Sequence, residues 1–373
     1  DVRNEMLYSA VAEQRLRATQ SFASIEFFDA ISICVPTPLA KNKHPDLSYL
    51  LASVEAVRNH LKSGKLVIVE STIPPGATRE IILPILQKAG LAVGRDFFLA
   101  YSPKRVNPGN KYLAPRSIPK IIGGMTSRCT TIAANLYRQF LERIILVSSV
   151  ESAEMVKLLE DSFCSVNLAL ANEMASLCRK FGVDAWEVVE AAKSKPFDFL
   201  PFYPGPGISG QSTAGERSYL DKTPGMSGVK PLLVEIATMV NSQLPTVALN
   251  RITDTLNERK RSINGSRILV LGISQIRDRK YTRESLSLDI LKALHEKGAI
   301  VTYSDPHVPS IEFDGKMFTS TSVTADIVGS VDCVLILTNH SAFDYQTIVA
   351  HSPLVLDCRN ALRKYHADNV VAV

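Results

Sequence analysis

The sequence lacks the features that mark membrane, secreted and metal-binding proteins. No apolar run approaches the ~18 residues of a membrane-spanning helix, and the first twenty or so residues contain no signal-peptide core. The six cysteines form no C-x-x-C pair, which favours free thiols over a disulfide or zinc framework. The seven histidines show no metal-ligand spacing, so we expect surface or capping positions for them and no metal. These absences predict a cytoplasmic protein that does not use a membrane.

The chain also lacks a block of charge of one sign. Its formal net charge of +5 is spread along the sequence, without the basic–aromatic interleaving of nucleic-acid-binding proteins. We therefore expect no nucleic-acid partner. A small anionic ligand fits the mild positive balance at least as well.

Glycine is missing before Gly64. A complete dinucleotide-binding domain opens with a glycine-rich turn, G-x-G-x-x-G, in its first βαβ unit. We therefore expect a fold without this opening unit. Either the chain is truncated there or the fold has lost its cofactor fingerprint.

Strand and helix patterns alternate on both sides of one long apolar helix. Residues 152–181 carry apolar side chains at three- and four-residue steps, and further apolar residues spread around the helix. Short apolar runs typical of buried parallel strands lie at 30–35, 65–70, 97–101, 121–122, 144–147, 267–272, 300–304, 333–337 and 354–357. The pattern predicts an α/β fold with two Rossmann-like, doubly wound parallel-sheet domains joined by a long central helix, the first domain lacking its opening βαβ unit. Because one α/β layer cannot cover this helix, we expect a homodimer through it.

A series of short motifs runs in order along almost the whole chain. They are Cys34-Val-Pro-Thr-Pro38, Glu70-Ser-Thr72 with Pro75-Gly76, Leu99-Ala-Tyr-Ser-Pro103, Asn107-Pro-Gly-Asn110, Ile118-Pro-Lys-Ile-Ile-Gly-Gly124, Glu154-Met-Val-Lys157, Ala171-Asn-Glu173, Tyr203-Pro-Gly-Pro-Gly207, Thr282-Arg-Glu-Ser285, Tyr303-Ser-Asp-Pro306 and Asp357-Cys-Arg-Asn360. Each motif is weak alone. Together they resemble the UDP-glucose/GDP-mannose dehydrogenase family, and within it the branch that oxidises UDP-N-acetylglucosamine or UDP-N-acetylmannosamine at C6.

This resemblance implies an NAD-dependent oxidoreductase that takes a UDP-sugar to its uronate through intermediates on a cysteine, for polysaccharide precursor synthesis. It implies an incomplete N-terminal NAD-binding-type domain at 1–150, a central helical dimerisation and active-site region at 151–260, and a C-terminal UDP-sugar-binding domain at 261–373. The residues implied for NAD are Thr37, Thr72 and Arg283. Those implied for the UDP-sugar are Tyr203, Gly207, Gly210 and Arg359.

The catalytic positions depart from the family's pattern. The residues implied at the reaction centre are Ser212, Lys157, Asp161, Glu216, Thr72 and Lys104. Ser212 stands where the family has its cysteine, and Glu216 where it has an aspartate. Lys104 reverses the charge of a family glutamate, and Asp161 replaces an asparagine. A catalytically silent nucleotide-sugar-binding or assembly subunit of the same fold is therefore the alternative to a working dehydrogenase.

Several of these residues have plainer interpretations. Lys157 and Asp161 lie at i, i+4 and fit a simple helix ion pair. Thr72 fits a cap for the helix after Pro75. Asp305 fits either an acid that binds a ribose or the start of an ordinary turn. Residues 210–214 match G-x-S-x-A, although the serine hydrolase motif needs a preceding strand.

Overall fold

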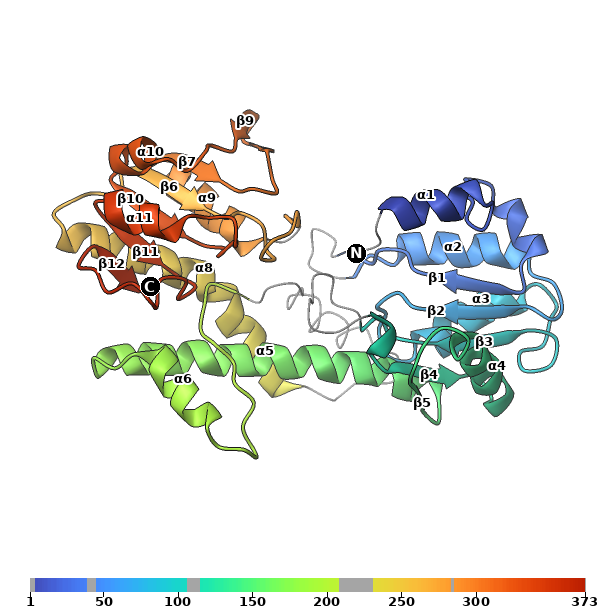
Figure 1. The fold of residues 1–373 in the computed structure, drawn as a ribbon. Coiled ribbons are helices and arrows are strands. Elements are labelled where there is room, and N and C mark those ends of the chain that lie inside the picture. Colours follow the sequence, from blue (N-terminus) through green and yellow to red (C-terminus); the bar gives the residue numbers. More distant parts are fainter. Residues whose placement is uncertain (1–3, 39–44, 106–114, 208–230, 283–284, 373) are drawn as a thin grey trace. The chain divides into compact units, whose positions relative to one another are not determined.

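The protein is described by a computed structural model over residues 4–38, 45–105, 115–207, 231–282 and 285–372. Within this part of the chain, residues 4–162 belong to one compact unit, and residues 163–207 and 232–372 belong to a second. Figure 1 colours both units along the sequence.

The first unit is built on a five-stranded sheet in the order β1-β2-β3-β4-β5. Its strands are β1 (Ala30–Ile33), β2 (Leu66–Val69), β3 (Phe98–Tyr101), β4 (Lys120–Gly124) and β5 (Ile144–Leu146). Neighbouring strands are parallel except β3 and β4, which pair antiparallel. All five predicted strands of this half are therefore confirmed, while the expectation of an all-parallel sheet is wrong for this one pair.

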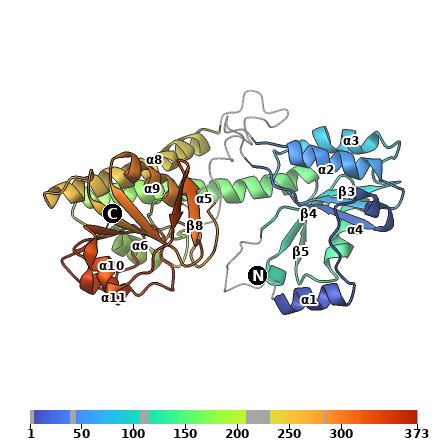
Figure 2. The same ribbon diagram turned by 90° about the horizontal axis from the view of Figure 1, so that it is seen from above.

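Helices cover both faces of this sheet, as Figure 2 shows. The helical elements are α1 (Asn4–Ala12), η1 (Phe22–Phe27), α2 (Ser48–Asn59), η2 (Thr78–Ile82), α3 (Leu83–Gln87), η3 (Pro115–Ser117) and α4 (Ser127–Tyr137). Leu50 and Val54 of α2 pack with Leu86 of α3 on one face. Ala133 and Tyr137 of α4 pack on the other. Because both faces are covered, every residue of β2 and β3 is buried.

The second unit contains an all-parallel five-stranded sheet in the order β12-β11-β10-β6-β7. Its strands are β6 (Arg267–Leu271), β7 (Ile300–Ser304), β10 (Cys333–Ile336), β11 (Val355–Asp357) and β12 (Val370–Ala372). The sequence predicted the first four of these and missed β12. It also missed the antiparallel hairpin of β8 (Ser310–Phe313) and β9 (Lys316–Thr319).

Helices again lie on both faces of the second sheet (Figure 2). Those on the sheet are α8 (Leu232–Glu258), α9 (Leu286–Glu296), α10 (Ala325–Ser330) and α11 (Tyr345–His351), whereas α6 (Ala185–Lys193) has no buried residue. Ile252 of α8 and Ile290 of α9 pack on one face, and Val328 of α10 and Ile348 of α11 on the other. This is the doubly wound arrangement that the sequence predicts.

The long central helix is α5 (Val150–Lys180), predicted at 152–181. It begins among the residues of the first unit and continues among those of the second. Arg179 and Lys180 occupy its last turn, where cations suit the helix dipole. Gly182 follows with a φ of +68°, the left-handed conformation that ends many helices.

Among the described helices, α8 is long and apolar enough by length and composition to cross a membrane. Core helices of soluble proteins pass the same test. The C-terminal half of α8 packs in this way, since Ile252 and Leu256 are wholly buried in the core of the second unit. This half therefore has the contacts of a core helix, whereas Leu232, Leu233 and Ile236 in the first turns are exposed.

Candidate functional site

The carboxyl ends of β1 and β2 place two predicted cofactor residues in direct contact. Thr37 follows β1 and Thr72 follows β2, and the Thr37 hydroxyl donates to the Thr72 carbonyl at 2.9 Å. Ligands of doubly wound folds bind outside the carboxyl ends of parallel strands. The two half-buried threonines at this edge therefore lie where a dinucleotide is expected to contact the protein. The described residues before Gly64 include no glycine turn for its pyrophosphate.

The helix after Pro75 is capped by Glu154 of α5, not by Thr72. Glu154 is 1% exposed, and its carboxylate accepts from the backbone amides of Gly76 at 2.6 Å and Thr78 at 3.0 Å and from the Thr78 hydroxyl at 2.6 Å. Burial raises the pKa of Glu154, and these hydrogen bonds offset only part of that effect. The capping interpretation of Thr72 is therefore wrong, because another side chain takes the amides at the start of η2.

Lys157 and Asp161 form the i, i+4 ion pair that the sequence left open. Lys157 Nζ lies 2.5 Å from Asp161 Oδ1, and the two side chains are 11% and 14% exposed. A carboxylate thus neutralises the lysine that the family resemblance places at the reaction centre. The pair lies in a poorly solvated part of α5, where charge attraction is stronger than at an open surface.

Lys104 and Arg105 follow β3 and differ in environment. Lys104 is exposed. Arg105 is half-buried and forms an ion pair with Glu160 of α5 at 2.6 Å, while also donating to the Pro119 carbonyl at 2.7 Å. Arg105 therefore joins the loop after β3 to the long helix, whereas the charge-reversed Lys104 faces solvent.

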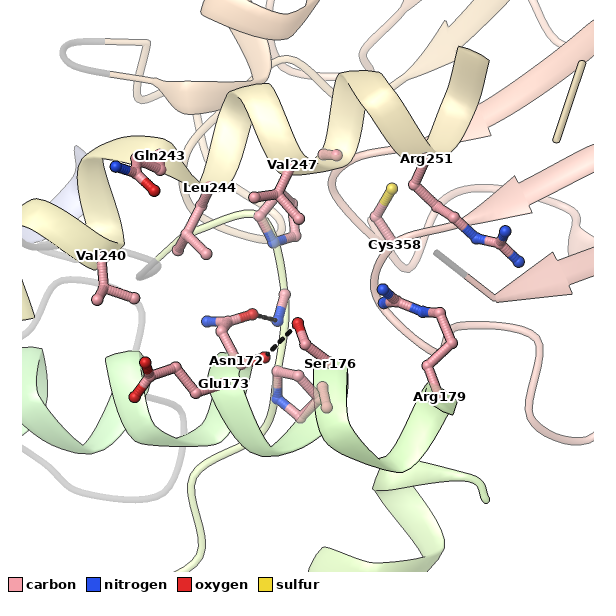
Figure 3. A pocket seen from close by; sticks show the side chains of 15 residues that line it. Asn172, Glu173, Ser176, Arg179, Val240, Gln243, Leu244, Val247, Arg251 and Cys358 are labelled. Atoms are coloured by element: carbon pink, nitrogen blue, oxygen red, sulfur yellow. Dashed lines mark hydrogen bonds between the residues drawn. The ribbon is translucent and has the colours of Figure 1, made fainter. Parts of the chain in front are cut away.

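In the second unit, α5 positions the loop that contains Tyr203 and Gly207. The Gly205 amide donates to Asn172 Oδ1 at 3.1 Å, a contact drawn in Figure 3. The Gly207 carbonyl accepts from Arg359 Nη1 at 3.1 Å, and Arg359 Nε donates to the Leu337 carbonyl at 2.8 Å. The structure therefore brings Gly207 and Arg359 together, two residues that the sequence predicted for one ligand.

Gly207 has to be a glycine for two reasons. Its φ is +152°, a conformation that other residues rarely adopt. A Cβ atom there would lie 2.0 Å from Cδ1 of Leu286. The loop therefore passes close to the first residue of α9, and the Gly207 carbonyl is held towards Arg359. Burial lowers the pKa of Arg359, which nevertheless remains a cation at neutral pH.

Tyr203 is held by two residues of α6. Its ring stacks on Trp186 with centroids 4.8 Å apart, and its hydroxyl donates to Glu190 Oε1 at 2.7 Å. Burial and the hydrogen bond to Glu190 raise the pKa of the tyrosine. Tyr203 thus anchors the start of the loop.

Four of the predicted site residues lie outside the described residues: Gly210, Ser212, Glu216 and Arg283. The G-x-S-x-A stretch lies outside them as well. Residues 205–210 also match G-x-G-x-x-G by letter. The part described, 205–207, follows a loop and not a strand, so it lacks the context of a dinucleotide turn.

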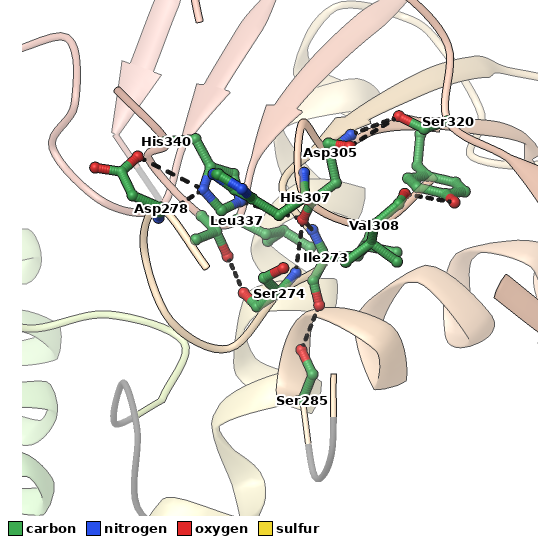
Figure 4. Close-up of polar contacts among 12 residues, drawn as sticks. Ile273, Ser274, Asp278, Ser285, Asp305, His307, Val308, Ser320, Leu337 and His340 are labelled. Atoms are coloured by element: carbon green, nitrogen blue, oxygen red, sulfur yellow. Dashed lines mark hydrogen bonds and ion pairs between the residues drawn. The ribbon is translucent and has the colours of Figure 1, made fainter. Parts of the chain in front are cut away.

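A buried polar cluster lies at the carboxyl ends of β6, β7 and β10 (Figure 4). Asp305 is 2% exposed and accepts at 2.9 Å from the backbone amides of Ile273, Ser274 and His307. His340 Nε2 lies 3.1 Å from Asp305 Oδ2. Burial alone raises the pKa of Asp305, but the hydrogen bonds from His340 and from the backbone amides lower it to about 2. Asp305 therefore acts as a structural acceptor that ties three strand ends together.

His340 corrects the expectation that the histidines lie at the surface or in caps. It is wholly buried, and its Nδ1 accepts from the Asp278 amide at 2.8 Å, so Nε2 carries the proton that Asp305 accepts. Among the described residues, ligand atoms of Asp278, His307 and His340 lie within 4.8 Å of one another. Because both His340 nitrogens already have partners, His340 itself offers no free lone pair to a metal in this arrangement.

Sequence models for all three domains of one family match the chain in order. The NAD-binding domain of the UDP-glucose/GDP-mannose dehydrogenase family matches residues 2–141, its central domain residues 151–243, and its UDP-binding domain residues 269–364. The chain belongs to this family. The predicted family and its cofactor, NAD, are thereby confirmed.

Individual relatives of the family agree with this assignment. The chain is 33% identical over 325 residues to the UDP-N-acetyl-D-mannosamine dehydrogenase of Methanococcus maripaludis strain C7, which covers 86% of this chain and 71% of the relative. It is 31% identical over 330 residues to the UDP-N-acetyl-D-glucosamine 6-dehydrogenase of Pseudomonas aeruginosa, a match that covers 88% of this chain and 78% of the relative. Nucleotide-sugar dehydrogenases are thus its relatives.

The solved structure of UDP-D-ManNAc dehydrogenase from Pyrococcus horikoshii is 29% identical, with a TM-score of 0.87 over 99% of this chain and 86% of that one. The predicted fold class, with its two Rossmann-like domains and long central helix, is confirmed.

Proposed function

We propose that this family member is a nucleotide-sugar 6-dehydrogenase by descent. It binds NAD and a UDP-N-acetylhexosamine or UDP-glucose, in the oxidation that supplies uronates for polysaccharides. The contact between Arg359 and the Gly207 carbonyl carries this proposal, because it holds a guanidinium beside the loop expected to take the UDP-sugar. Guanidinium groups suit phosphate oxygens by charge and by geometry.

The proposed binding residues fall into two sets, one for NAD and one for the UDP-sugar. Thr37 and Thr72 hold the cofactor at the carboxyl edge of the first sheet, together with Arg283. Bound NAD supplies the acceptor for the hydride that leaves the sugar. Tyr203, Gly207, Gly210 and Arg359 hold the UDP-sugar. The division into regions 1–150, 151–260 and 261–373 belongs to the same proposal.

A second candidate function is a catalytically silent nucleotide-sugar-binding or assembly subunit. The ion pair between Lys157 and Asp161 favours it, because a neutralised lysine stabilises a developing oxyanion less than a free one does. The substitutions at Ser212, Glu216 and Lys104 also favour it.

We also propose a cytoplasmic homodimer formed through α5. All six cysteines are free thiols, as expected in a reducing compartment. Apolar side chains of α5 remain exposed along its length in the described part of the chain: Met155, Leu159, Phe163, Leu170, Met174 and Leu177. A helix of a second copy would cover this surface.

Calorimetry and an absorbance assay test these proposals together. We expect binding of UDP-N-acetylglucosamine or UDP-N-acetylmannosamine, and binding of NAD. Tight NAD binding without any UDP-sugar binding would contradict the proposed substrate site. Formation of NADH separates a dehydrogenase from a silent subunit.

A further inference from the structure

A pocket of about 240 Å³ lies in the second unit between α5, α8 and residues 204–206. Figure 3 shows it from close by. Tyr203, Gly207 and Arg359, the described residues proposed for the UDP-sugar, do not line it. Its wall on α8 includes the apolar side chains of Leu244 and Val247, with Gln243 beside them.

Two arginines occupy one end of this pocket. Arg179 comes from the last turn of α5 and Arg251 from α8, and both side chains project into the space between the helices (Figure 3). Glu173 lies towards the opposite end. Partial burial and the positive charge of Arg251 lower the pKa of Arg179.

Neither arginine is well neutralised by the part of the chain that the structure describes. No ion pair of Arg179 occurs there. Arg251 has one carboxylate contact, with Glu258 at 3.7 Å. Its side chain is 24% exposed, and its Nε is buried without a hydrogen-bond partner. Buried donors normally have an acceptor, so the described residues leave the hydrogen bonding of Arg251 incomplete.

We propose that this pocket binds a phosphate monoester, with the phosphate between Arg179 and Arg251 and the organic group along Leu244 and Val247. A phosphate dianion balances two guanidinium charges, whereas a carboxylate balances one. Arginine forks present several N–H donors to phosphate oxygens at once. The apolar wall does not bind the phosphate, but it shields an attached organic group from water. The pocket shares residues 204–206 with the loop proposed for the UDP-sugar, but Arg179, Arg251 and the α8 side chains have no part in that proposal.

Titration calorimetry of the full chain tests the proposal with phenyl phosphate, inorganic phosphate and phenol as probes. We expect phenyl phosphate to bind at least tenfold more tightly than either of the other two. Arg251→Gln and Arg179→Gln should each weaken its binding at least tenfold, and Arg251→Lys should weaken it less. Arg259→Gln is the matched control, because Arg259 follows α8 directly, is exposed and lies outside the pocket.

Four outcomes would overturn the proposal. The first is that phenyl phosphate does not bind the unmodified chain at millimolar concentration. The second is that Arg259→Gln weakens the binding of phenyl phosphate as much as Arg251→Gln does. Phenol or inorganic phosphate binds as tightly as the ester. Lastly, UDP-N-acetylglucosamine displaces phenyl phosphate competitively, which would make the pocket part of the nucleotide-sugar site. Because Arg179 is exposed, Arg179→Gln should fold normally, and its melting temperature verifies this.

Discussion

Asn172 of the long helix holds the backbone of Gly205, because its Oδ1 accepts from the Gly205 amide at 3.1 Å while its Nδ2 donates to the Leu168 carbonyl at 3.0 Å. The second bond fixes the orientation of the amide, so that the oxygen faces the loop. Two residues further on, the Gly207 carbonyl meets Arg359. Asn172 therefore positions the loop through which the chain is proposed to bind a UDP-sugar.

Replacing Asn172 tests this link. Asn172→Leu leaves the Gly205 amide without its acceptor, and we expect UDP binding to weaken about tenfold, which corresponds to ~1.4 kcal/mol. Asn172→Asp retains an acceptor oxygen, so its loss should be smaller. Calorimetric titration with UDP measures both variants. Equal affinity of Asn172→Leu and the unmodified chain would show that the hydrogen bond does not order the loop for binding.

The sequence predicted the regular elements better than the polar contacts between them. Apolar periodicity located α5 within two residues at its start, since a helix buried on several sides repeats its pattern over many turns. The exposed β8–β9 hairpin and the short edge strand β12 carry little apolar signal and were missed. The antiparallel pairing of β4 was missed because a strand's apolar pattern does not encode its direction.

The site was predictable where residues lie close to a recognised motif. The motif residues Gly207 and Arg359 meet as expected, although 152 positions separate them in sequence. Glu154 and Asn172 lie in quoted motifs, but their partners at Gly76 and Gly205 depend on packing that the sequence does not display. Nothing in the sequence pairs Arg179 with Arg251, because no motif contains either of them.

Glu154 should stabilise the first unit through the start of η2. Glu154→Gln replaces one carboxylate oxygen with an amide donor, which would face the Gly76 or Thr78 amide. We expect a loss of ~1–3 kcal/mol in the free energy of unfolding, the usual effect of an unsatisfied buried polar group. Urea unfolding measures it.

The matched control is Glu151→Gln, one turn earlier in α5. Glu151 forms a partly exposed ion pair with Arg79 at 2.5 Å, and exposed pairs contribute little. A loss for Glu154→Gln no larger than that for Glu151→Gln would mean that the cap at η2 is unimportant.

Asp305 should make stability depend on pH in acid. Its pKa of about 2 in the folded protein lies below the ~3.9 of an unfolded chain. The ionised group therefore contributes stability above about pH 4, and this contribution is lost as the pH falls towards 2. Asp305→Asn should cost on the order of 2 kcal/mol at pH 7, and the difference from the unmodified chain should narrow below pH 4.

Chemical denaturation at a series of pH values provides this comparison. The control is Asp314→Asn, at an exposed position in the β8–β9 turn, which should leave the free energy of unfolding nearly unchanged. A difference between Asp305→Asn and the unmodified chain that stays constant down to pH 2.5 would contradict the proposed contribution of the ionised carboxylate.

The exposed apolar residues of α5 predict an association that charge disrupts. Leu170 and Leu177 are 52% and 49% exposed and lie two turns apart. Leu170→Glu with Leu177→Glu should convert a dimer to a monomer, since each buried carboxylate would lose its hydration. Light scattering at micromolar concentration gives the mass. Phe27→Glu, at an 86% exposed position of η1, should leave the dimer intact, and a monomeric unmodified chain would contradict the proposal outright.

The last prediction is that the chain as written does not complete oxidation to the acid. A serine hydroxyl is almost wholly protonated at neutral pH, whereas a cysteine with a pKa near ~8.5 is a few per cent thiolate. An acyl group on Ser212 would be an ordinary ester, whose alkoxide leaves less readily than a thiolate. Lys157, the cation implied for the oxyanion, is neutralised by Asp161 at 2.5 Å.

Restoring the cysteine alone should therefore fail. We expect no uronate from Ser212→Cys, because Asp161 still pairs with Lys157 and because Lys104 and Glu216 remain altered. Adding Asp161→Asn releases the lysine and should give more product than Ser212→Cys does. The assay supplies NAD and UDP-N-acetylhexosamines, follows NADH by absorbance and identifies the uronate by mass spectrometry. Lys157→Met in the double variant is the control and should abolish the gain. Steady formation of uronate by the unmodified chain would refute the prediction, because Ser212 would then be sufficient for the full reaction.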